Sequence, residues 1–305
     1  MRRALATAAA VLALGALAAC AETDEPAAPA SDGPAYPVTV GSLTLDKRPE
    51  KIVVLSPTAT EMLFAIGAGS QVTAADDNSN YPAEAPKSDL SAFQPNAEAV
   101  AAKNPDLVVL SNDLNKIVSQ LGALKIPVYH APAAVTLDDT YKQLTELGTL
   151  TGHPDEAADV VQRMKDDIAK LVKDVPQRTD KLTYYYELGP ELYSLTSKTF
   201  VGSIFSQLGL ENIADASDPT GAQGGYPQLS AEVIIKADPD LIFLADTKCC
   251  SQSAATVKAR TGWTDIAAVK NSHVVGLDDD IAGRWGPRIV DLVRAVTDAV
   301  AKLPA

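Results

Sequence analysis

One pattern occurs twice in the chain, in stretches that begin at Ala97 and Ala231, 134 positions apart. The first stretch reads AEAVAAKNPDLVVLS and the second AEVIIKADPDLIFLA, with six identities in fifteen positions. Each has the apolar spacing of a short helix, a turn at Pro-Asp, and an apolar run typical of a buried strand. A unit that occurs only twice and far apart is not a solenoid repeat. It predicts two similar lobes, although Pro-Asp-Leu between a helix and a strand also recurs in unrelated α/β chains.

Expected strands and helices alternate around both copies of this unit. In the first half we expect strands at 51–56, 71–76, 107–110 and 125–131 and helices at 60–69 and 97–103. In the second half we expect strands at 182–188, 241–246 and 273–278, helices at 200–209 and 286–303, and the repeated helix and turn at 231–240. The alternation predicts an α/β fold of two Rossmann-like lobes with mostly parallel sheets.

A long helical stretch separates the two halves. Apolar residues keep helical spacing from about residue 138 to residue 175, and the segment around Pro154 interrupts them. The stretch is therefore either two abutting helices or one kinked helix. We expect an N-terminal lobe at residues 37–136, a linking helix at 137–176 and a C-terminal lobe at 177–305.

The N-terminal residues MRRALATAAAVLALGALAAC have the features of a targeting segment. Two arginines precede an apolar run that is short for a membrane-spanning helix and typical of a signal peptide. The ending resembles the lipobox of bacterial lipoproteins, which implies removal of residues 1–19 and lipidation of Cys20; the alternative is an ordinary signal peptide. Residues 20–36, rich in Ala, Pro and acidic residues, are expected to form a flexible tether. We therefore expect an extracytoplasmic protein, lipid-anchored to the cell membrane.

Composition and motifs argue against several classes of function. The formal net charge of −13 argues against binding of nucleic acid, whose phosphates attract Lys and Arg. There is no phosphate-binding glycine loop, no paired metal-ligand spacing and no nucleophile elbow. We therefore expect no catalytic residue, no metal ligand and no cofactor. An enzyme on the same frame is an alternative that would require His130 beside Cys249 and Cys250, with an acidic neighbour.

The adjacent Cys249 and Cys250 have two interpretations. Outside the cytoplasm thiols tend to oxidise. A bridge between neighbours is strained, because their Cα atoms are only about 3.8 Å apart. The pair is either a vicinal disulfide or two buried free thiols.

Polar and aromatic residues gather where the expected strands end. In open α/β sheets, ligands bind outside the carboxyl ends of the strands. The candidates there are Ser56, Thr58, Asn78 to Tyr81, Phe93, Ser111 to Asp113, Tyr193, Tyr226, Cys249, Cys250, Arg284 and Trp285. Such side chains on two lobes predict a ligand clamp.

Four segments together resemble the substrate-binding proteins of ABC importers for cobalamin and ferric siderophores. They read RPEKIVVLSPTATEMLFAIGAG, SNYPAEA, NAEAVAAKNPDLVV and WGPRIVDLVRAV, and the resemblance covers about residues 48 to 303. The similarity is nearest to the cobalamin-binding branch, through Ser56-Pro57, Thr60-Glu61, Ser79 to Pro82 and Pro287 to Ile289. It implies two α/β lobes bridged by a long helix.

The resemblance also implies partners. In this family one glutamate on each lobe docks onto arginines of the membrane permease, and the matching residues are Glu98 and Glu232. Each also lies in the first turn of an expected helix, where the helix dipole favours an acid in any case. The implied partners are an ABC permease dimer with its ATPase, a small-molecule chelate, and the membrane through the lipid anchor. The protein itself is expected to be monomeric.

The expected ligand site departs from the cobalamin branch. Tyr193 and Tyr226 match aromatic positions of that branch, whereas Ser111 and Asn78 stand where it has tryptophan and tyrosine. The resemblance places Arg284 at a cleft arginine that could pair with a ligand phosphate or carboxylate. The full expected ligand-binding set is Asn78, Tyr81, Phe93, Ser111, Tyr193, Tyr226, Arg284 and Trp285.

These features together predict the solute-binding component of an ABC importer, which captures a metal chelate between two lobes. Cobalamin or a related corrinoid is favoured, and a ferric siderophore or haem is the alternative. A ligand-sensing lipoprotein without a permease is a further alternative.

Overall fold

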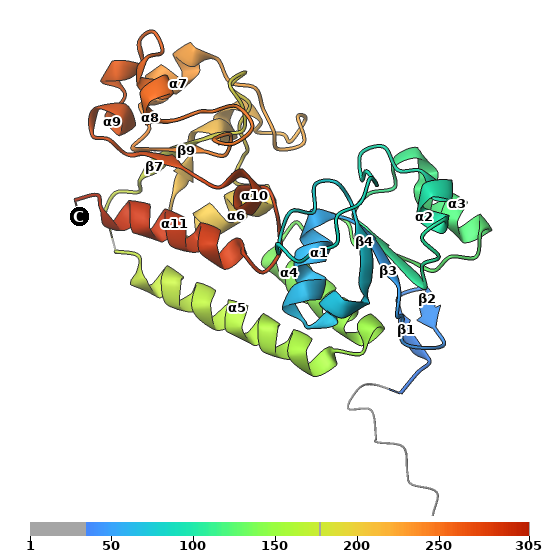
Figure 1. The fold of residues 1–305 in the computed structure, drawn as a ribbon. Coiled ribbons are helices and arrows are strands. Elements are labelled where there is room, and N and C mark those ends of the chain that lie inside the picture. The colour runs from blue at the N-terminus through green and yellow to red at the C-terminus, as the bar shows by residue number, and fades with distance from the viewer. Residues whose placement is uncertain (1–34, 177, 305) are drawn as a thin grey trace, which may run out of the picture. The chain divides into compact units, whose positions relative to one another are not determined.

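The computed structural model describes residues 35–176 and 178–304, which form the two α/β lobes that the sequence predicts (Figure 1). The expected signal peptide, Cys20 and most of the expected tether lie outside the described residues. Tyr36, at the end of the expected tether, belongs instead to the folded body. Its hydroxyl donates to the Leu150 carbonyl at 3.0 Å, and its ring packs against the core.

The N-terminal lobe is built on a sheet of four parallel strands in the order β4-β3-β5-β6. The strands are β3 (Ile52–Leu55), β4 (Val72–Ala75), β5 (Leu107–Leu110) and β6 (Val128–His130), and the helices are α1 (Pro57–Ala65), α2 (Ala97–Ala101) and α3 (Ile117–Ala123). β3 and β5 are buried along their whole length, which is why they read as unbroken apolar runs. An antiparallel hairpin of β1 (Val38–Val40) and β2 (Leu43–Leu45), which we did not predict, precedes this sheet.

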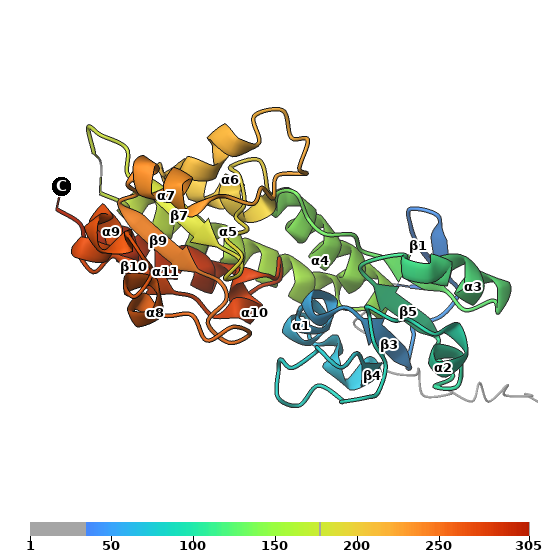
Figure 2. The same cartoon turned by 90° about the horizontal axis from the view of Figure 1, so that it is seen from above.

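The C-terminal lobe repeats this topology, with four parallel strands in the order β10-β9-β7-β8. The strands are β7 (Thr183–Glu187), β8 (Glu211–Asn212), β9 (Leu241–Leu244) and β10 (Val274–Gly276), and the helices are α6 (Phe200–Gln207), α7 (Ala231–Ala237), α8 (Ala254–Lys258), α9 (Ala267–Lys270) and α10 (Asp279–Ala282). In each sheet the second strand along the chain, β4 or β8, lies at one edge. The first, third and fourth strands of that sheet follow it in this order across the sheet. Figure 2 shows β7 and β9 side by side.

The repeated sequence unit occupies the same place in both sheets. It forms α2 and β5 in the first lobe and α7 and β9 in the second. Both helices are capped by a polar side chain: Asn96 accepts from the Ala99 N–H and Ser230 from the Val233 N–H. The shared pattern therefore reflects a shared capped helix that leads into a central buried strand.

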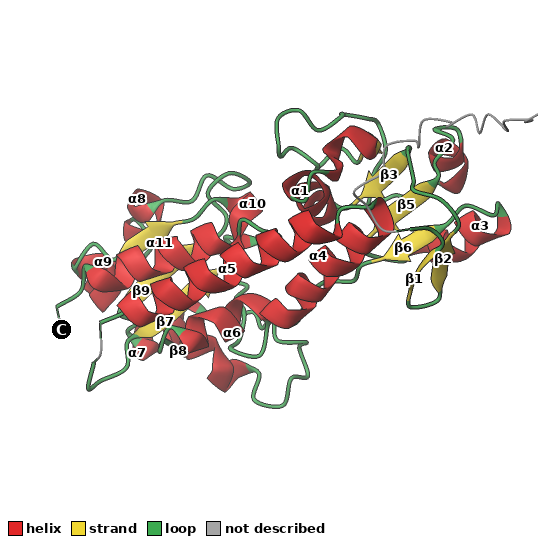
Figure 3. Ribbon diagram, turned by 90° about the horizontal axis from the view of Figure 1, so that it is seen from below, coloured by secondary structure: helices red, strands yellow, loops and turns green. Residues whose placement is uncertain are grey.

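The helical stretch between the lobes is two helices, α4 (Leu137–Thr151) and α5 (Pro154–Asp174). Gly152 follows α4 in the left-handed conformation, with φ of 78°, and Pro154 occupies the start of α5. α5 packs against α4 and against the closing helix α11 (Ile289–Ala301), as Figure 3 shows. One hydrophobic core joins these helices to a face of each sheet.

Candidate functional site

Four large aromatic side chains are exposed among the described residues, and all four belong to the expected ligand-binding set. The exposed fraction is 46% for Tyr81, 71% for Phe93, 47% for Tyr193 and 50% for Tyr226. Each lies in a loop beyond the carboxyl end of a strand, two in the loop after β4 and two in the segments between β7 and α7. Exposed aromatic rings in such loops indicate a binding surface.

The loop that carries Tyr81 is held in place by hydrogen bonds to the buried carboxylate of Asp76. The Asp76 carboxylate accepts the Asn78 N–H at 2.8 Å and the Ser79 hydroxyl at 3.1 Å, and Ser79 also bonds to Thr60. Burial raises the pKa of Asp76. Asn78 itself is exposed, and its side-chain amide donates to Asp77. The loop geometry is therefore fixed by backbone and buried contacts, while its outer side chains stay accessible.

The loops that carry Tyr193 and Tyr226 pair with one another. Tyr193 forms an antiparallel bridge with Gln228, the Ser194 N–H donates to the Pro227 carbonyl at 2.9 Å, and the Leu229 N–H donates to the Leu192 carbonyl at 3.0 Å. The buried Asp218 carboxylate closes the preceding turn by accepting the N–H groups of Gln223 and Gly225. Both tyrosines therefore project from a backbone that is already ordered.

A buried carboxylate, Glu61 on α1, binds two arginines that precede α11. Glu61 is 3% exposed. It accepts Arg284 Nη1 at 2.7 Å, and Arg288 through Nε at 2.9 Å and Nη2 at 2.5 Å. The Arg288 guanidinium also lies over the Tyr81 ring, 4.1 Å from its centroid. Loss of Glu61 would leave two arginines without their shared counter-ion in a largely buried position.

Arg284, expected to pair with a ligand, is engaged by the protein itself. Besides Glu61, its guanidinium binds Asp280 at 2.8 Å and the Asn78 carbonyl at 3.1 Å. Only 10% of its side chain is exposed. The indole N–H of Trp285 also has a partner within the protein, since it donates to Gln143 at 3.0 Å. We therefore leave Arg284 out of the proposed ligand set.

Asp279 holds the loop that follows β9. Its carboxylate accepts the backbone N–H groups of Thr247, Lys248 and Cys249. Cys249 and Cys250 are unbridged, and Cys249 is exposed rather than buried as the free-thiol interpretation assumed. The neighbouring Cys250 thiol raises the pKa of Cys249 to about 12, so the thiol form dominates.

Two buried carboxyl groups face each other near this loop. Glu187 at the end of β7 binds Arg260 through two contacts of 2.6 Å. Asp246, two residues after β9, is also fully buried, and no N–H or O–H group of the described residues donates to its carboxyl oxygens. Burial and the negative charge of nearby Glu187 raise the pKa of Asp246 to about 7. A proton on Asp246 leaves Asp246, Glu187 and Arg260 together without net charge.

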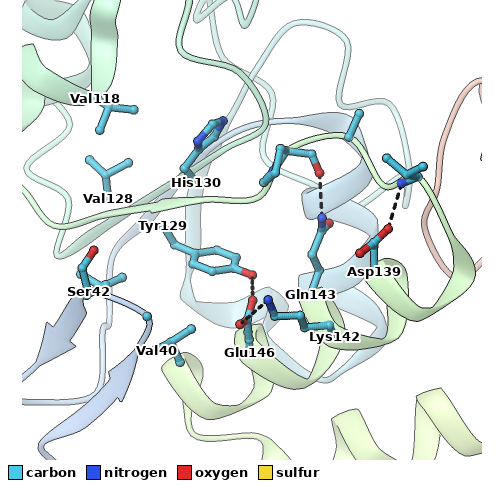
Figure 4. Close-up of a pocket in the computed structure, with 15 residues that line it drawn as sticks. Val40, Ser42, Val118, Val128, Tyr129, His130, Asp139, Lys142, Gln143 and Glu146 are labelled. Carbon is cyan, nitrogen blue, oxygen red and sulfur yellow. Dashed lines mark hydrogen bonds and ion pairs between the residues drawn. The ribbon is translucent and has the colours of Figure 1, made fainter. Parts of the chain in front are cut away.

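A pocket of about 520 Å³ lies apart from these aromatic loops, between the β1–β2 hairpin, β6 and α4 (Figure 4). Tyr129 donates to Glu146 at 2.5 Å on its wall, and His130 lies at its rim. All of its lining residues fall between Val40 and Glu146, so neither Cys249 nor Cys250 lines the pocket that His130 lines.

The remaining candidate residues are exposed or half-buried. Ser111 is half-buried directly after β5, while Glu98 and Glu232 are exposed in the first turns of α2 and α7.

Within residues 35–176 and 178–304, no cluster of three or more His, Cys, Asp or Glu could hold a metal ion. In the same part of the chain no helix has the length and apolarity to cross a membrane.

Sequence reasoning assigned no role to Glu61, Arg288 or the Glu187–Asp246 pair. One signal was available for Glu61, because it interrupts the apolar face of α1 beside Met62 and Leu63, which are fully buried. A lone acid in such a face must be paired when it is charged. Its partners could not be read from the sequence, since they lie 223 and 227 positions away.

Comparison with known proteins gives consistent matches along most of the chain. The family model for periplasmic binding proteins matches residues 52–281. An uncharacterised ABC transporter substrate-binding lipoprotein of Bacillus subtilis is 28% identical over 279 residues, which cover 87% of this chain and 86% of the relative. A cobalamin-binding protein of Halobacterium salinarum is 30% identical over 267 residues, which cover 85% and 71%. A solved structure from Staphylococcus epidermidis, described as a possible iron-binding solute-binding protein, matches with a TM-score of 0.72 at 27% identity, over 84% of this chain and 100% of the other.

Proposed function

This chain belongs to the periplasmic binding protein family, and from that premise we propose that it captures a metal chelate, a corrinoid in the first place, for an ABC importer. The single observation that carries the proposal is that the exposed aromatic side chains of the described residues gather in loops beyond strand ends of both lobes. Aromatic faces bind large flat rings by stacking, without chemistry. The proposed contacts are Asn78, Tyr81, Phe93, Ser111, Tyr193, Tyr226 and Trp285.

Three cations near these loops are already paired within the protein, which favours a chelate that does not depend on them. Arg284 and Arg288 are paired with Glu61, and Lys248 is paired with Asp278 and Asp280. An anionic catecholate chelate or the propionates of haem would need a cation that is not already neutralised. Cyanocobalamin has no such need. A ferric siderophore remains the second candidate, because the similar Staphylococcus epidermidis protein is described as iron-binding.

Docking on a permease is the second part of the proposal. Glu98 and Glu232 occupy equivalent, exposed positions on α2 and α7, and the two helices lead into equivalent strands. Two matching carboxylates can engage a pair of basic sites on a permease dimer and thereby set the orientation of docking. Lipidation of Cys20 would keep the protein near that permease. A similar lipoprotein of an ABC transporter supports this arrangement.

Calorimetric titration of cyanocobalamin into tyrosine variants tests the proposed contacts. We expect Tyr193→Ala and Tyr226→Ala each to weaken binding roughly tenfold, because loss of one stacked ring costs about 1.5 kcal/mol. The matching Phe variants should bind nearly as the parent does, since the ring is kept. Leu124→Ala removes another exposed apolar side chain, one outside these loops, and is the control. Parent-like affinity of both alanine variants would refute the contacts.

A further inference from the structure

We propose that Arg288 is a positioning residue, which holds the ring of Tyr81 in place to receive the ligand. The proposal rests on the proposed function, because it assigns Tyr81 to the ligand surface. It adds a residue that itself stays behind that surface, and it explains why an exposed aromatic side chain in a long loop can be ordered before the ligand arrives.

The two side chains form a cation–π contact. The guanidinium carbon of Arg288 lies 4.1 Å from the centroid of the Tyr81 ring, well within the roughly 6 Å range of cation–π attraction. Tyr81 nevertheless keeps 46% of its surface exposed. One face of the ring is therefore covered by a cation, and a large part of the side chain is left for a ligand.

Glu61 fixes the plane of the guanidinium. It accepts both Nε and Nη2 of Arg288, at 2.9 and 2.5 Å, and such a two-point contact orients the fork as well as binding it. Glu61 is buried in α1, so its own position is set by the core of the N-terminal lobe. A lysine at position 288 could keep the charge, but it could not keep the two-point contact with Glu61.

The loop that precedes Tyr81 is hydrogen-bonded to Arg284 and Asp280. Arg284 Nη2 donates to the Asn78 carbonyl at 3.1 Å, and the Asn80 amide donates to Asp280 at 3.1 Å. Among the described residues no hydrogen bond to the Tyr81 hydroxyl is formed. The backbone is thus anchored by other residues, and the ring is oriented by Arg288. An ordered ring lowers the entropy that is lost when the ligand binds.

The test combines Arg288→Lys with Tyr81→Leu in the purified chain, and it has one arm without ligand. In the ligand-free arm, the protein carries fluorotyrosine, and Tyr81→Phe identifies the Tyr81 fluorine resonance. We expect that resonance to shift and broaden in Arg288→Lys. Arg260→Lys is the matched control: Arg260 likewise binds a buried glutamate, Glu187, and stacks on a ring, Trp263, in the other lobe. It should leave the Tyr81 resonance unchanged.

In the binding arm, calorimetry with cyanocobalamin should show Arg288→Lys about three- to tenfold weaker than the parent. In the Tyr81→Leu background the same change should have no further effect, because Arg288 acts through the ring. An unchanged Tyr81 resonance in Arg288→Lys overturns the proposal, and so does an equal loss of affinity in both backgrounds. If the parent does not bind cyanocobalamin, the corrinoid assignment fails, and the fluorine arm still decides the role of Arg288. If the lysine variant does not fold, Arg288→Gln replaces it in both arms, because glutamine keeps a donor for Glu61 and removes the cation from the Tyr81 ring.

Discussion

Replacement of both Glu98 and Glu232 by lysine is expected to abolish uptake of the ligand, while its affinity for the isolated protein stays unchanged. Each change replaces attraction by repulsion at a docking contact, and disruption of one close charge pair at an interface costs roughly 2–5 kcal/mol. Both residues are exposed, and their helices are capped by other side chains, so the fold should tolerate the change. The measurement is transport into vesicles or cells that contain the cognate permease.

The matched control for this experiment is lysine at Asp138 and Asp155. These acids are exposed in the first turns of α4 and α5, so their replacement makes the same change in net charge and in local helix environment. The control should leave uptake unchanged. Normal uptake by the double variant at Glu98 and Glu232 would contradict the docking proposal.

Asp246→Asn is expected to stabilise the protein by up to roughly 4 kcal/mol at pH 8 and to have a much smaller effect at pH 4. The pKa of Asp246 is raised in the folded state from 3.8 to about 7. The folded state therefore holds this proton more tightly than the unfolded state does. The corresponding stability is fully present below about pH 4 and is lost as pH rises toward 7. Asparagine resembles the protonated acid and stays neutral at every pH.

Urea unfolding at pH 4 and pH 8 measures this effect as the difference between variant and parent. Asp174→Asn, at an exposed position in the last turn of α5, controls for the removal of one negative charge. Equal destabilisation by Asp246→Asn at both pH values would contradict a protonated Asp246, because it would mean that an ionised Asp246 stabilises the fold.

Much of the architecture could be predicted because its signals are local. The strands β5 and β9 each follow a capped helix and a Pro-Asp turn, so a short window of sequence specifies the whole unit. The β1–β2 hairpin was missed, because its three-residue strands around Gly41 are too short to show a period of two.

Of the candidate site, only the exposed side chains could be recognised from the sequence. Exposed aromatic residues in loops after strands can be recognised one by one, as Tyr193 and Tyr226 were. The supporting contacts join residues far apart in sequence: Glu61 meets Arg288 227 positions away, and Glu187 meets Arg260 73 positions away. The family resemblance implied that Arg284 is a cleft arginine, but only the structure shows that Glu61 and Asp280 already neutralise it.

The most direct test of the account is a calorimetric titration of residues 35–305 with cyanocobalamin, a ferric hydroxamate, a ferric catecholate and haem. We expect saturable one-to-one binding of cyanocobalamin, with little or no binding of the anionic catecholate and haem. Tight binding of either anionic chelate, with none of cyanocobalamin, would contradict the corrinoid assignment and the charge argument together. Absence of binding by all four would contradict the capture of a metal chelate itself.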